Sequence, residues 1–222
     1  MFFERDNYLY FLMGIQNYLC GSMDVLAYCL MPTHYHLLVR VKPQARQPQT
    51  SEFLKNSEVL AAASIQQQTS EVFKTSEVSA AVSAAAASRQ VSLAMQKFGI
   101  SYTKAINKRF GRVGALFQGQ FHLYLRYWRR QGKPIRNYAH LLSLCVYIHA
   151  NPVKDGLVAL PEDWEYSNYL DWIGLRSGTL LDREFIQEHF GSPAEYKSLV
   201  LDYLRTRSLP EEVGKYILDL ED

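Results

Sequence analysis

The chain has 222 residues, 48% of them hydrophobic, so it can bury a sizeable core. It has no apolar run of the roughly 18 residues that a membrane span requires, and its N-terminal segment lacks the layout of a signal peptide. We therefore expect a cytoplasmic protein without a membrane partner. Its three cysteines form no Cys-x-x-Cys pair, which argues against disulfides or a cysteine-based zinc site.

The net charge of +2 conceals an uneven distribution along the chain. No acidic residue occurs between Glu77 and Asp155, whereas this stretch holds twelve lysines and arginines interleaved with aromatic residues. From Asp155 onward the balance reverses, with fifteen acidic against six basic residues. An acid-free stretch of basic and aromatic side chains suits a nucleic acid, which offers phosphates and bases, although a solvated basic surface has the same composition.

The first elements expected in chain order are a helix and two strands. Apolar residues at helical spacing predict a helix over residues 6–19, with Asp6 as its N-cap. Residues 24–30 and 34–41 have the composition of strands. Their connection, residues 31–33, is short enough to make them antiparallel neighbours.

Residues 43–90 differ in kind from the rest, being rich in Ala, Ser, Gln, Thr and Glu. Within them, residues 50–62 match residues 69–81 at nine of thirteen positions. Two copies are too few for a solenoid, and alanine and serine bury too little surface to offset the entropy of ordering. We expect a low-complexity insertion that is mobile or loosely helical.

The remainder of the chain is expected to be mainly helical. Helices are predicted over residues 91–109, 138–150, 182–189, 193–205 and 210–220. Gly111 and Gly114 are expected to end the first of these helices, and Pro152 the second. Residues 116–121 fit a short strand. This order predicts an α+β fold, with an antiparallel sheet, flanking helices and a helical C-terminal tail.

Four polar residues form a candidate site. His34 and His36 are two apart in an expected strand, where alternate side chains share a face, so two imidazoles can hold one metal ion. Tyr147 and Asn151, four apart, share one face of an expected helix, where the phenol can act as nucleophile and the amide oxygen as a third ligand. Mg²⁺ or Mn²⁺ accepts this mixed set. Taken alone, Tyr147 could equally be a tyrosine that packs in the core, and Asn151, which precedes a proline, could equally be a residue that ends the helix.

Four motifs occur in an order that is typical of one protein family. They are AYCLMPTHYHLLV (27–39), SYTKAINKRFGRVGALFQGQF (101–121), YIHANPVKDGLV (147–158) and EDWEYSNY (162–169). These segments resemble the HUH-type single-tyrosine transposases, and look most like the insertion-sequence-200-like and REP-associated tyrosine transposases. The resemblance covers most of the chain outside the insertion.

This resemblance implies a ferredoxin-like HUH fold in which His34, His36 and Asn151 bind the divalent metal. Tyr147 falls on the family's nucleophile, and Tyr35 fills the bulky position between the histidines. The implied activity is cleavage and rejoining of single-stranded DNA beside hairpins, through a 5′-phosphotyrosine and without ATP. Relatives carry a further N-terminal strand that ends in an Asn-Arg-Gly-like turn, so we expect the sheet to lack its first strand.

On this interpretation the transposase domain comprises residues 1–42 and 91–170, and residues 171–222 form an acidic helical C-terminal region. The expected partner is single-stranded or hairpin DNA, and a homodimer is compatible with the family, which contains both dimers and monomers. The residues expected to contact DNA lie in the acid-free stretch: Lys104, Lys108, Arg109, Arg112, Gln118, Arg126, Arg129, Arg130, Lys133 and Arg136.

The sequence is compatible with two other functions. A catalytically inactive remnant of such a transposase would bind hairpin DNA without cleaving it, since its sheet lacks a strand. A zinc-binding structural protein would use the histidine pair only to stabilise its fold.

Overall fold

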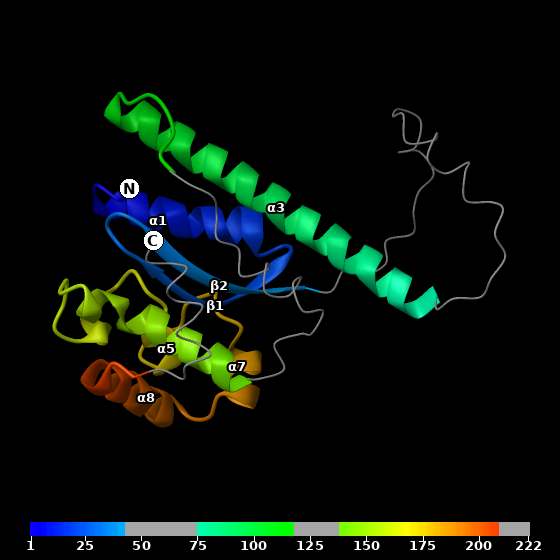
Figure 1. The fold of residues 1–222 in the computed structure, drawn as a ribbon. Coiled ribbons are helices and arrows are strands. Elements are labelled where there is room, and N and C mark those ends of the chain that lie inside the picture. Colours follow the sequence, from blue (N-terminus) through cyan, green and yellow to red (C-terminus); the bar gives the residue numbers. More distant parts are fainter. Residues whose placement is uncertain (43–74, 118–137, 209–222) are drawn as a thin grey trace, which may run out of the picture. The chain divides into compact units, whose positions relative to one another are not determined.

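The protein is a mixed α+β structure, seen in a computed structural model that describes residues 1–42, 75–117 and 138–208. In these ranges β1 (Met23–Leu30) and β2 (Tyr35–Val41) form a two-stranded antiparallel sheet (Figure 1). The predicted strand pair is therefore confirmed. Backbone contacts divide the chain into two compact units, one of residues 43–90 and the other of residues 1–42 with 91–222.

The helix predicted before the strands is confirmed as α1 (Arg5–Gly14), which continues as a π-helical turn, η1 (Ile15–Leu19). Its predicted N-cap, Asp6, is wrong, because the cap is Glu4, which has an extended backbone. The buried side chain of Asn7 closes this turn by accepting hydrogen bonds from the backbone N–H groups of Phe3 (2.9 Å) and Glu4 (3.2 Å). The first turn is thus held by the side chain of a residue within the helix, Asn7.

The next two helices both exceed their predicted ranges. α3 (Thr75–Phe110) begins before residue 91 and ends where Gly111 adopts a φ of 62°, as predicted. α5 (Tyr138–Lys154) runs through Pro152, so the predicted stop there is wrong. Pro152 lies in the last turn, where its missing N–H costs a single helical bond, and its carbonyl accepts from the N–H of Leu157 at 2.8 Å.

The chain forms further helices between the end of α5 and residue 208. They are η2 (Pro161–Asp163), α6 (Tyr169–Trp172), α7 (Arg183–His189) and α8 (Pro193–Thr206). α7 and α8 confirm two predicted helices, whereas the short η2 and α6 were not predicted. The helix predicted over 210–220 lies outside the described residues, as does most of the strand predicted over 116–121. No helix in the described ranges is long and apolar enough to cross a membrane.

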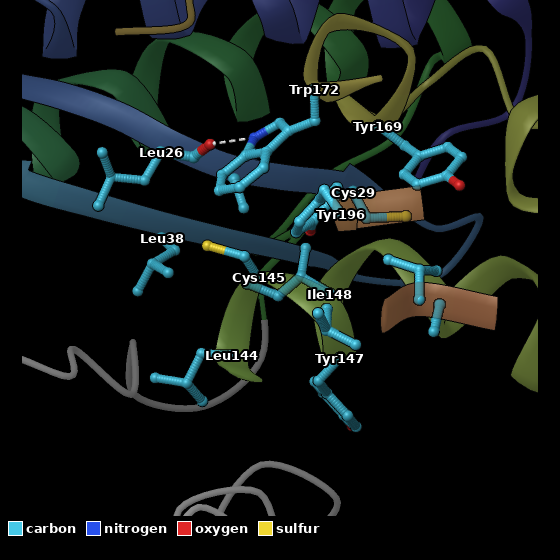
Figure 2. Packing of buried hydrophobic residues seen from close by; sticks show 14 of the residues in the cluster. Leu26, Cys29, Leu38, Leu144, Cys145, Tyr147, Ile148, Tyr169, Trp172 and Tyr196 are labelled. Carbon is cyan, nitrogen blue, oxygen red and sulfur yellow. Dashed lines mark hydrogen bonds between the residues drawn. The ribbon is translucent and has the colours of Figure 1, made fainter. Parts of the chain in front are cut away.

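β1 is buried on both faces, because helices pack on each side of it. One face lies in a cluster with side chains of α1 and of α3, among them Phe11, Phe98 and Tyr102. The other face packs against α5, α6 and α8, including Tyr147 and Tyr196 (Figure 2). β1 therefore contributes side chains to two hydrophobic clusters, one on each face. This burial on both faces explains why its sequence is apolar along nearly its whole length.

A hydrogen-bonded clamp joins β1, α5 and α8. The side chain of Asn168 accepts from the N–H of Tyr28 (2.6 Å) and donates to the carbonyl of Leu26 (3.0 Å), which orients its amide. The Nε2 of His149 lies 2.8 Å from the same amide oxygen, so Nε2 carries the proton. The other nitrogen, Nδ1, then accepts from the hydroxyl of Tyr196 at 2.6 Å. The clamp requires a neutral imidazole, and burial lowers the pKa of His149 to about 4.

We expect acid to weaken this clamp. Because the pKa of His149 is about 4 in the folded chain and near 6.5 in the unfolded one, the unfolded chain takes up a proton first as pH falls. The contribution of His149 to stability is complete above pH 6.5 and is lost between pH 6.5 and 4, which amounts to roughly 3 kcal/mol. The free energy of unfolding, measured in urea at several pH values between 6.5 and 4, tests this loss of stability. His149→Gln, which cannot titrate, should show a shallower decline, and an equal decline in both proteins would contradict the assignment.

We also expect the contact between α1 and α3 to depend on Gly14. A Cβ at this position would lie 2.4 Å from Cε2 of Phe98, a ring that is 1% exposed and cannot move aside cheaply. Gly14→Ala should lower the free energy of unfolding by about 1–3 kcal/mol, despite the better helix propensity of alanine. Gly21→Ala is the matched control, because a Cβ there meets nothing within 4 Å. Denaturant unfolding of the two variants should separate them, and equal stabilities would refute the crowding at Gly14.

Candidate active site

The turn between β1 and β2 brings the two histidines together. The N–H of Met31 donates to the carbonyl of His34 at 2.9 Å, which places His34 just before β2 and His36 within it. Their Nε2 atoms lie 3.1 Å apart, with the ring planes at 88°. Two ligands that each lie about 2.1 Å from one cation, at a right angle, are about 3 Å apart. The distance is that of a hydrogen bond between the two imidazoles, and it also suits two ligands of one metal ion.

The surroundings of His34 favour its neutral form. Its Nδ1 lies 3.1 Å from the hydroxyl of Thr33, so Nε2 is the ring nitrogen directed at His36. Burial lowers the pKa of His34, and the negative charge of Asp155 opposes this shift. A neutral imidazole is the form that binds a metal, so His34 can act as a ligand near neutral pH.

Tyr35, between the histidines, belongs to the opposite face of the sheet. Its ring lies 4.7 Å from the ring of Phe11 and 6.1 Å from that of Phe117. Burial raises the pKa of its phenol, which keeps it protonated. This environment disfavours Tyr35 as a nucleophile.

α5 places Tyr147 beside the histidine pair. The ring centroids of Tyr147 and His36 are 5.9 Å apart, with the planes at 81°. Tyr147 is only 2% exposed, and the ring of Tyr203 from α8 lies 6.5 Å from it. On the same helix, Nζ of Lys154 lies 3.5 Å from its hydroxyl and 4.9 Å from its ring centroid. The candidate nucleophile thus adjoins the candidate ligands but is covered in this structure.

Asn151 lies one helical turn after Tyr147 and is buried, at 2% exposure. Its Nδ2 donates to the backbone carbonyl of Tyr147 at 3.1 Å, so its oxygen is the side-chain atom suited to a cation. Among the residues that the structure describes, no three His, Cys, Asp or Glu side chains gather into a metal-binding group. The ligand set predicted from the sequence differs from such groups, since it completes two imidazoles with an amide.

The predicted DNA-contacting residues fall partly within the described ranges. Lys104, Lys108, Arg109 and Arg112 are exposed at or just beyond the C-terminal end of α3. Arg109 forms ion pairs with Glu4 and Asp6, and the guanidinium of Arg112 lies 5.1 Å from the ring centroid of Phe3. The other six lie outside the described residues: Gln118, Arg126, Arg129, Arg130, Lys133 and Arg136.

Lys154, Tyr203 and Asn168 have roles around this site that were not predicted. Lys154 follows Tyr147 by seven residues, two helical turns, so the spacing in the sequence could have placed both on one face of α5. Asn168 belongs to the EDWEYSNY motif, but the motif did not indicate its contact with α5, and no signal marks Tyr203. Both contacts with α5 join segments that are distant in the sequence.

Comparison with known proteins gives no relative for this chain. No family model matches its sequence, no curated protein matches it, and no solved structure matches it.

We expect the histidine pair to bind Mn²⁺. His34→Gln should weaken Mn²⁺ binding by roughly 10-fold or more, because it removes one of two imidazoles at ligand spacing. Titration of free Mn²⁺ by electron paramagnetic resonance measures the affinity. His140→Gln, on the first turn of α5, is the control and should bind as the unmodified protein does. Equal binding by the two variants would refute the assignment.

Proposed function

We propose that the protein is an HUH-type single-tyrosine DNA transposase, which cleaves and rejoins single-stranded DNA at hairpins. The observation that carries the proposal is the meeting of His34, His36 and Tyr147: two imidazole nitrogens at ligand spacing, with a phenol ring against one of them. These are the three residues on which the family's metal-binding and nucleophile motifs fall. The mixed α+β architecture is compatible with a ferredoxin-like HUH fold, which forms part of the proposal.

In the proposed reaction, Tyr147 attacks the phosphorus of a phosphodiester. The bond from its Oη to phosphorus forms as the bond to the 3′-oxygen breaks, which leaves a 5′-phosphotyrosine and a 3′-hydroxyl. The phenolic proton passes to solvent, and the departing 3′-oxygen takes one up. Attack by a 3′-hydroxyl on the phosphotyrosine reverses these steps and rejoins the strand, so no nucleotide hydrolysis is needed.

His34 and His36, with the amide oxygen of Asn151, are the residues that would hold a divalent cation. Mg²⁺ or Mn²⁺ bound there supplies polarisation of the scissile phosphate. The described distances fit the histidines to this role, and Asn151 follows Tyr147 on the same helix. The exposed Lys104, Lys108 and neighbouring arginines would contribute phosphate contacts that position the strand.

The second candidate is a catalytically inactive DNA-binding protein. The burial of Tyr147 favours it, because a phenol that is 2% exposed cannot reach phosphorus unless its cover moves. Both candidates predict binding of hairpin DNA, and only the transposase predicts a covalent adduct.

We expect Tyr147→Phe to abolish covalent protein–DNA adducts while leaving DNA affinity within about twofold, because only the nucleophilic oxygen is removed. The assay incubates labelled single-stranded DNA carrying a hairpin with the protein and Mn²⁺, then separates adducts on a denaturing gel. Tyr203→Phe is the matched control, since its ring lies beside Tyr147, and it should retain adduct formation. Adducts formed by Tyr147→Phe would show that another residue is the nucleophile, and their absence with the unmodified protein would favour the inactive DNA-binding protein.

A further inference from the structure

Lys154 is the cation that the structure brings closest to the phenol oxygen of Tyr147 among the described contacts. It occupies the last position of α5, two turns beyond Tyr147. Its ammonium lies 3.5 Å from Oη and 4.9 Å from the ring centroid, so it reaches over the face of the ring as well as the hydroxyl. Lys154 is partly exposed, whereas Tyr147 is buried.

This arrangement bears on how a phosphate could approach Tyr147. Reacting atoms must come to about 3–3.5 Å before bond formation, so a phosphorus atom in line with Oη brings its non-bridging oxygens near the ammonium. Lysine is a compact positive charge on a flexible stem, and a phosphodiester is a stronger partner for it than a neutral phenol. An arriving phosphate would therefore draw the ammonium from the hydroxyl to its own oxygens.

We propose that Lys154 covers Tyr147 in the free protein and binds a non-bridging oxygen of the scissile phosphate when DNA arrives, which uncovers Oη for attack. This role rests on the proposed function. Lys154 forms and breaks no covalent bond in it and transfers no proton; its charge moves from the phenol to the phosphate. The ring of Tyr203 also lies beside Tyr147, but Lys154 is the neighbour of the phenol that a phosphate attracts.

The first test measures binding without cleavage. The protein is titrated onto a fluorescent single-stranded oligonucleotide with EDTA present, at several salt concentrations. Lys154→Met should weaken binding several-fold and reduce the slope of log affinity against log salt by about 0.7, the value for one phosphate contact on a single strand. Lys154→Arg should keep the slope. Arg205→Met, which removes an exposed cation of α8 outside the acid-free stretch, is the matched control and should leave the affinity unchanged. Thermal unfolding verifies that each variant is folded.

The second test adds Mn²⁺ and follows covalent adducts. Lys154→Met should slow their formation by roughly 10-fold or more at saturating DNA, and Lys154→Arg should restore most of the rate. An unchanged salt slope in Lys154→Met overturns the phosphate contact, as does an unmodified protein that binds no DNA. A reduced slope with an unchanged adduct rate also overturns it, because the lysine then contacts a phosphate other than the scissile one.

The two tests separate this inference from the proposed function. A salt slope that depends on Lys154, in a protein that forms no adduct, refutes the transposase activity and leaves only a contact between the lysine and a DNA phosphate. Adducts that form equally well in Lys154→Met support the transposase and refute the role of the lysine.

Discussion

The arrangement of the candidate site depends on the hydrogen bonds of one buried amide. Asn168 binds both the N–H of Tyr28 and the carbonyl of Leu26 on β1, and its oxygen also accepts from His149 on α5. An amide that is held at both ends fixes which nitrogen of the imidazole carries its proton, and through Tyr196 it fixes α8 as well. Because Tyr147 lies two residues before His149, the clamp sets where the phenol meets His36.

Local patterns sufficed for much of the fold. The two strands, their antiparallel pairing and α7 and α8 follow from apolar runs and turn residues that act over a few positions. The errors at Asp6 and Pro152 have a common cause, because in each case a residue other than the expected boundary residue satisfies the helix end. Asn7 completes the first turn of α1 from within, and the carbonyl of Pro152 finds Leu157 beyond the helix. The spacing of residue types does not reveal these partners.

The same holds for the candidate site: contacts within one element were predictable from the sequence, and contacts between elements were not. Strand alternation predicts that His34 and His36 share a face, and helical spacing predicts the same of Tyr147 and Asn151. The meeting of Tyr147 with His36 is a tertiary contact, which only the packing of α5 on β2 supplies. The burial of Tyr147 lay beyond sequence reasoning for the same reason, since Tyr203 comes from a distant helix.

The irregularity in β1 has a further consequence for the histidines. Val25 pairs with Val39 and Ala27 with Leu38, so Leu26 is an extra residue without an opposite partner. Met23 and Val25 therefore belong to the core beside α1 and α3, whereas Ala27 and Cys29 belong to the core beside α5. A single inserted residue thus reverses the parity of the strand midway along its length. Insertion or deletion of one residue in either strand would move every side chain beyond that position to the opposite face of the sheet. At the bulge, such a change could be absorbed while the histidines keep facing α5.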